Sequence, residues 1–353
     1  MEYFYQTSDS APRLFPAIRL FGNFFKADGF KDERMIAKGN HQQGEWGEAH
    51  APVVVGRKAE ALPKSFSIGW LSVAEQKCYG LAEEIDQTLV EREWNRKDNE
   101  GNDLFQYFVL GMAPYGGVAL WLRGETKSVI LGYYKAFDMT NDEKTAKHYL
   151  LRRTPSDICR EYLATHEAVA HHLSVTGLPL PHLFDHWMQQ FEYRFVPLEE
   201  YWDGERWQEY DEEDIYYDDI DLNVLEVQRY DGTHDQTNDF SLLCYHKAGM
   251  PRQLKVKWSA ERNDFSAYYW LDDETVWTLM HRFTNLMPSA RISMLLRIDT
   301  RCQRYELALK GDDESFQQPI ALPQEVFQLL VFKDGNELYR SNNFNKGDGA
   351  WNW

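Results

Sequence analysis

The sequence has few cysteines, a shortage of basic residues and no long apolar run. Its four cysteines are far apart and form no CxxC pair, which excludes zinc-ribbon and thioredoxin-type motifs. Scattered cysteines in a chain of this length suit a reducing compartment. No window approaches the ~18 apolar residues of a membrane-spanning helix, and the first ten residues lack the pattern of a signal peptide. We therefore expect a soluble, cytoplasmic protein with no membrane partner.

The excess of acidic over basic residues limits which classes of macromolecule the protein can bind. The chain carries 38 Lys and Arg against 56 Asp and Glu, which gives a formal net charge of −18. Nucleic-acid binding requires a basic surface for the phosphates, so this balance argues against a nucleic-acid partner. An excess of negative charge favours solubility and the capture of a basic protein.

Aromatic residues are abundant and indicate a β-rich protein, because strands favour aromatic and β-branched side chains. The clearest signal lies in Phe105–Gly124, where two apolar runs flank the turn GMAPYGG and predict a hairpin. A third strand is expected over Ser128–Lys135. Gly111 and Gly116 are spaced like the two glycines of a phosphate-binding loop. That loop continues with Lys-Ser/Thr and a helix, whereas a strand is expected here.

Three short stretches of the first half have counterparts in the second half, in the same order. The pairs are Leu62–Trp70 with Met250–Trp258, Gln87–Val90 with Trp277–Met280, and Leu120–Gly124 with Leu307–Gly311. This pattern indicates a diverged internal duplication of a strand–helix–hairpin unit. The expected fold is therefore α+β, with two related β-rich units, mostly antiparallel sheet, and extra helices in the first unit.

Composition suggests four parts along the chain. They are an N-terminal arm (1–57), a first β-rich unit with helices (58–198), an acidic aromatic segment (199–221) and a second β-rich unit (222–353). Within the first unit, Leu81, Ile85 and Leu89 recur at helical spacing. Thr154 and Pro155 open a further helix that is expected to end at Gly177.

Two histidine pairs are candidate metal ligands. In His166–His171 the spacing is one residue longer than the zinc-protease HExxH, so on a helix the two rings diverge. His182 and His186 share a helical face, which is expected to be exposed. A catalytic metal site also needs a third ligand and a cleft. The residues therefore predict no metal, no cofactor and no catalytic site.

The acidic aromatic segment is the strongest functional candidate. Twelve of its 23 residues are Asp or Glu against one base, Arg206, so it contributes −11 to the net charge. Six large aromatics are interleaved with the acids, which is unusual for disordered chain. Tyr and Trp are frequent binding hot spots, and surrounding acids speed the capture of a basic partner. A solvated acidic loop is the alternative interpretation.

Three stretches give the chain a resemblance to a known family. They are the LP…W strand at Leu62–Trp70, the GxAPxGGxxxWL turn at Gly111–Leu122 and the GLP…W…FxYRF stretch at Gly177–Phe195. At these residues, roughly 60–200, the chain resembles a bacterial family of unknown function, numbered 2931 among the domains of unknown function. Some members resemble lipoproteins, whereas this sequence shows no signal peptide or lipid-attachment cysteine. Members sit beside secreted or polymorphic toxins, which implies an immunity role.

The sequence thus predicts a protein without catalytic activity that neutralises a cognate toxin, delivered by a type VI or polymorphic (Rhs-type) system, by blocking its active site. The expected contacts are Trp202, Trp207, Tyr210, Asp211, Glu212, Glu213, Asp214, Tyr216 and Tyr217. The partner would be a protein toxin with a basic surface. Two alternatives are a metal-dependent hydrolase that uses His182 and His186, and a structural accessory protein of a secretion system.

Overall fold

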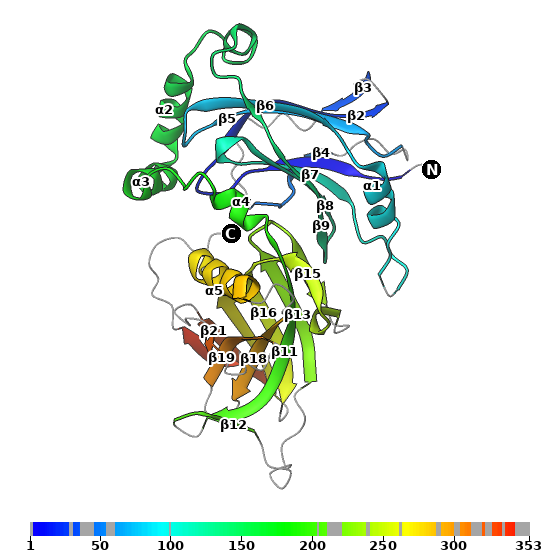
Figure 1. Cartoon of the computed structure of the whole chain (residues 1–353), viewed down its shortest axis with the longest axis vertical. Coiled ribbons are helices and arrows are strands. Elements are labelled where there is room, and N and C mark those ends of the chain that lie inside the picture. The colour runs from blue at the N-terminus through cyan, green and yellow to red at the C-terminus, as the bar shows by residue number, and fades with distance from the viewer. Residues whose placement is uncertain are drawn as a thin grey trace. The chain divides into compact units, whose positions relative to one another are not determined.

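The computed structural model describes residues 3–27, 31–35, 46–53, 61–98, 100–202, 205–209, 221–237, 241–260, 263–286, 291–299, 304–311, 320–321, 327–333 and 336–342. The chain forms two units, Met1–Met188 with Asp231–Thr233, and Gln189–Tyr230 with His234–Asn352. Both are built mainly from antiparallel sheet, and most helices lie in the first half, as the sequence predicts (Figure 1). In the described part of the chain, no helix is long and apolar enough to cross a membrane.

The first unit contains ten strands, four α-helices, a 3-10 turn and a π-helical turn among its described residues. They are β1 (Gln6–Ser10), β2 (Ala17–Ala27), β3 (Lys31–Met35), β4 (His50–Val53), β5 (Ser65–Ser72), β6 (Lys77–Glu84), α1 (Gln87–Trp94), β7 (Tyr107–Met112), η1 (Pro114–Gly116), β8 (Gly117–Arg123), β9 (Ser128–Lys135), β10 (Phe137–Asp138), η2 (Thr145–Tyr149), α2 (Pro155–Thr165), α3 (Glu167–Thr176) and α4 (Leu183–Trp187).

These strands form two sheets that pack face to face (Figure 1). One sheet has the order β4-β1-β7-β8-β9 and the other β10-β6-β5-β2-β3. Among the described strands of this unit, every pair is antiparallel except β1 with β7. Apolar side chains from both sheets, such as Phe66 and Ile68 on β5 and Phe108 and Leu110 on β7, fill the core between them. Alternation along each strand places this apolar set on the inner face.

The second unit contains twelve described strands with α5 and a short 3-10 turn. They are β11 (Gln190–Trp202), β12 (Trp207–Glu209), β13 (Asp221–Arg229), β14 (His234–Thr237), η4 (Ser241–Leu243), β15 (His246–Gly249), β16 (Pro251–Ala260), β17 (Asn263–Trp270), α5 (Asp273–Leu286), β18 (Ile292–Asp299), β19 (Arg304–Gly311), β20 (Ile320–Ala321), β21 (Phe327–Lys333) and β22 (Asn336–Asn342). Strands β21 and β22 pair antiparallel.

The second unit repeats the topology of the first. The order β15-β11-β18-β19-β20 matches β4-β1-β7-β8-β9, and β21-β17-β16-β13-β14 matches β10-β6-β5-β2-β3. The parallel pair β1–β7 has its counterpart in β11–β18, and α1 and α5 occupy the same place in the chain order. The paired stretches found in the sequence fall on equivalent elements: Trp70 and Trp258, for example, are both fully buried. The duplication predicted from sequence is confirmed.

Two boundaries differ from the prediction. Residues 1–57 are not an arm, because β1 lies inside a sheet between β4 and β7, and β2 pairs with β5. The second unit begins at Gln189, so the acidic segment (residues 199–221) lies within this unit instead of between the two. The polar sequence of β1, QTSDS, gives no strand signal, since strands are recognised by their apolar alternation.

Two helices are also placed differently. Leu81 belongs to strand β6, which turns back on β5 through Glu75 and Gln76, so its helical spacing to Ile85 and Leu89 is coincidental. The helix opened by Thr154 ends at Thr165, and α3 begins one residue after His166. At the break, the His166 backbone N–H bonds to the Leu163 carbonyl. The Tyr162 carbonyl instead accepts from the Thr165 hydroxyl at 2.9 Å and lies 2.8 Å from the His166 Nδ1.

Candidate functional site

The acidic segment starts as a hairpin that extends one sheet of the second unit. Residues Tyr193–Glu199 of β11 pair with β18, and the continuation Glu200–Trp202 pairs with β12. Trp202 lies directly opposite Trp207 in this register. The other expected contacts lie outside the described residues: Tyr210, Asp211, Glu212, Glu213, Asp214, Tyr216 and Tyr217.

Both ends of this segment are part of the second unit's sheets. Its first residues belong to β11, and its last residue, Asp221, begins β13, which pairs along its length with β16. The segment is therefore a long connection between the two sheets of one sandwich, with a short hairpin at its start. A connection fixed at both ends loses less conformational entropy on binding than a free tail.

The glycine turn joins β7 to β8 with two residues in the left-handed region. Tyr115 has φ of +57° and Gly116 has φ of +76°. Only glycine adopts this conformation freely, and a Cβ on Gly116 would lie 2.8 Å from the Ala136 carbonyl oxygen. Gly111 lies within β7, where a Cβ would overlap the Trp121 ring. A strand follows this turn, so the glycines serve packing and turn geometry and do not form a phosphate-binding loop.

Glu75 holds the strained turn from the other sheet. Its carboxylate accepts hydrogen bonds from the Tyr115 backbone N–H and from the Tyr79 hydroxyl, both at 2.7 Å. The Tyr115 hydroxyl in turn donates to the Pro179 carbonyl at 2.8 Å. A non-glycine residue with positive φ persists only where its surroundings fix it, and these bonds supply that constraint.

The tyrosines around the turn remain hydrogen-bond donors at neutral pH. Burial, together with the hydrogen bond to Glu75, raises the pKa of Tyr79 well above its usual value. Burial also raises the pKa of Tyr133, whose hydroxyl donates to Asp185 on α4 at 2.9 Å. Because a raised pKa keeps a phenol protonated, neither side chain can act as a base here. Through these hydrogen bonds the cluster connects elements of the first unit.

The histidine pair on and before α4 lies on one side of that helix. The rings of His182 and His186 are 4.4 Å apart between centroids, and Phe184 is buried on the opposite side. His182 is exposed and His186 is half-buried. In the described part of the chain, no group of three His, Cys, Asp or Glu side chains has the geometry to hold a metal ion.

His166 has a structural place at the junction of α2 and α3. Its ring stacks on Tyr162 with centroids 3.9 Å apart, as expected for a histidine at the edge of the core. It precedes α3, whereas His171 lies within that helix and is exposed. The two residues therefore do not share one continuous helix.

Sequence reasoning missed a buried ion pair that connects the two sheets of the first unit. Asp9 on β1 and Arg19 on β2 form this pair, with side chains 1% and 4% exposed. Burial lowers the pKa of Arg19 to about 10, because a charge loses its hydration there. A charged residue in an alternating strand is normally assigned to the solvent face, so no local signal marks either side chain.

The described residues form a duplicated α+β protein in which each unit is a two-sheet sandwich with one parallel strand pair. The sequence model of the family described as "Protein of unknown function (DUF2931)" matches residues 5–173. This range covers β1 to most of α3, that is, both sheets of the first unit. The search of curated proteins and the search of solved structures each returned no match.

Proposed function

We propose that this protein is an immunity protein that acts by binding. It would neutralise a cognate toxin, delivered by a type VI or polymorphic (Rhs-type) system, by covering the toxin's active site in the cytoplasm. The observation that carries the proposal is the acidic segment fixed between β11 and β13, with Trp202 and Trp207 opposite each other at its start. The contact set remains the two tryptophans with Tyr210, Asp211, Glu212, Glu213, Asp214, Tyr216 and Tyr217.

The charge distribution supports a basic partner. Residues 199–221 contain twelve acids and one base, which is −11 of the net −18. Such a concentration of one sign accelerates diffusional encounter with an oppositely charged protein. Aromatic side chains among the acids supply the apolar contact area that slows dissociation once the complex has formed.

Co-purification tests the proposal directly. We expect the full chain to retain the protein encoded by the adjacent gene through size-exclusion chromatography at physiological salt, and to block that protein's toxicity when both are expressed. Replacement of Trp202 and Trp207 with Ala should weaken the complex at least tenfold, because aromatic anchors contribute about 2 kcal/mol or more. A toxic neighbour that neither binds this chain nor is neutralised by it would overturn the proposal.

A metal-dependent hydrolase is the second candidate, and the closeness of the His182 and His186 rings is the observation that favours it. The immunity proposal predicts that protein purified without a His tag carries far less than one equivalent of zinc by elemental analysis. It also predicts that His186→Ala leaves toxin neutralisation unchanged. Stoichiometric metal that is lost in His186→Ala would favour the hydrolase instead.

A further inference from the structure

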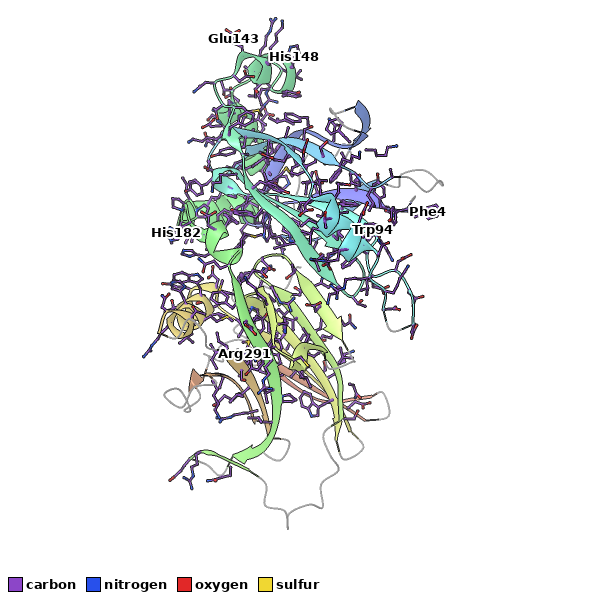
Figure 2. The ribbon with its side chains drawn as sticks, turned by 45° about the vertical axis from the view of Figure 1, so that its right-hand side comes forward. Phe4, Trp94, Glu143, His148, His182 and Arg291 are labelled. Carbon is purple, nitrogen blue, oxygen red and sulfur yellow. The ribbon has the colours of Figure 1, made fainter. Side chains whose placement is uncertain are left out.

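Cationic side chains gather around Ser293 in the second unit. Arg194 on β11, Ser293 on β18 and Lys310 on β19 are direct register partners across three neighbouring strands. Residues paired in this way carry their side chains on the same face, about 5 Å apart. Arg291, one residue before β18 and labelled in Figure 2, contacts the ring of Tyr245, which Arg194 also contacts.

Tyr245 organises the two arginines. The guanidinium carbon of Arg194 lies 4.6 Å from the centre of the Tyr245 ring, and that of Arg291 lies 5.1 Å from it. The Arg194 Nε donates to the Ser293 hydroxyl at 3.2 Å, and the Tyr245 hydroxyl lies 3.1 Å from the same oxygen. Contact with an aromatic ring fixes a guanidinium without satisfying its N–H groups, so Arg194 is held in place while its terminal nitrogens stay available as donors.

The positive charge of this cluster is only partly balanced. Glu192 pairs with Arg291 at 3.0 Å. Within the described ranges, Arg194 and Lys310 have no ion pair, and the terminal nitrogens of Arg194 have no hydrogen-bond acceptor. Two uncompensated cations thus lie on either side of one serine, in a chain with an excess of negative charge.

The first unit has the equivalent row with its charge neutralised. There, Gln6 on β1, Tyr107 on β7 and Arg123 on β8 are register partners. The Arg123 guanidinium pairs at 3.1 Å with Glu48, which lies just before β4. In the second unit, the segment just before β15, the counterpart of β4, supplies Tyr245.

The two copies share one feature of this row and differ in two others. A cation on the fourth strand of the sheet, Arg123 or Lys310, occurs in both copies and is compatible with the fold alone. The second copy has an arginine where the first has Gln6, and its row is contacted by the Tyr245 ring, whereas the row of the first copy is contacted by the Glu48 carboxylate. Both changes increase the affinity of the row for an anion.

We propose that Arg194, Ser293, Lys310 and Tyr245 form a binding site for a phosphate-type dianion. The planar edge of a guanidinium matches two oxygens of a phosphate or a carboxylate. The two uncompensated charges of Arg194 and Lys310 match a doubly charged phosphate better than a carboxylate with one charge. This site includes no residue of the acidic segment, so the phosphate-binding proposal and the immunity proposal are tested separately.

Isothermal titration calorimetry of the full chain with inorganic phosphate, at low ionic strength, tests the site. We expect saturable one-to-one binding, with acetate bound at least about tenfold more weakly. Arg194→Ala should weaken phosphate binding about tenfold or more, because each charge-assisted hydrogen bond that is lost has that order of effect. Lys257→Ala, an exposed cation on β16, is the matched control and should bind like the parent chain.

A second variant keeps the test valid if Arg194→Ala is unstable. Lys310→Ala removes charge without disturbing the ring contact of Tyr245, and should also weaken phosphate binding about tenfold, with an unchanged thermal unfolding midpoint. Absence of saturable phosphate binding to the parent chain would overturn the proposal. So would binding that survives both Arg194→Ala and Lys310→Ala.

Discussion

Replacement of Arg19 with methionine is expected to lower the free energy of unfolding of the first unit by about 3–5 kcal/mol, because it leaves the Asp9 carboxylate buried without a counter-charge. Both side chains are almost fully buried and connect β1 of one sheet to β2 of the other. Urea denaturation, monitored by tryptophan fluorescence, measures the change.

The double variant Asp9→Leu/Arg19→Met separates the pair's own contribution from the cost of an unpaired charge. It should recover much of the loss, since replacing both members of a buried pair by apolar groups is often close to neutral. Arg13→Met is the control, because Arg13 is partly exposed and has no ion pair among the described residues, and should change stability by about 0.5 kcal/mol or less. A loss below about 1 kcal/mol for Arg19→Met would show that the pair is dispensable.

Replacement of Asp211, Glu212, Glu213 and Asp214 with serine is expected to slow association with the proposed toxin partner about tenfold or more at low ionic strength. The four carboxylates lie in the most acidic stretch of the chain, and removal of charge from a binding surface mainly lowers the association rate. Stopped-flow fluorescence at several salt concentrations measures the effect. The difference should nearly vanish near 1 M salt, where the screening length is about 3 Å.

A matched variant distinguishes local charge from net charge. Replacement of the exposed residues Glu83, Glu84, Glu91 and Glu100 of the first unit with serine removes the same four charges elsewhere. This control should leave the association rate within about twofold of the parent, because the proposal places the contact in residues 199–221 and not on these carboxylates. Equal association rates for the two variants would rule out the acidic segment as the docking surface.

The internal duplication could be predicted from the sequence because equivalent core positions of the two units both require large apolar side chains. Trp70 and Trp258 are both fully buried on equivalent central strands, β5 and β16. Val90 and Met280 are likewise buried on α1 and α5. Burial restricts such positions to large apolar side chains, so their order and spacing survive divergence when surface residues do not.

The N-terminal strands could not be predicted from the sequence, because the residues that pair with them lie elsewhere in the chain. β1 is entirely buried apart from Gln6, yet its sequence is QTSDS. This strand pairs with β7, about a hundred residues later in the chain. Its buried Asp9 forms an ion pair with Arg19. A pairing partner so distant leaves no trace in local composition.

By itself, the sequence determined the α+β class, the two related units, the hairpin at the glycine turn and the concentration of negative charge in residues 199–221. These properties depend on local pattern and composition, which a single chain displays directly. Only the tertiary structure decided that β1 and β2 are interior strands, that Glu75 fixes Tyr115, and that Arg194 and Lys310 meet around Ser293. Those arrangements depend on strand register between segments far apart in the chain, and register is set by the packing of the whole sandwich.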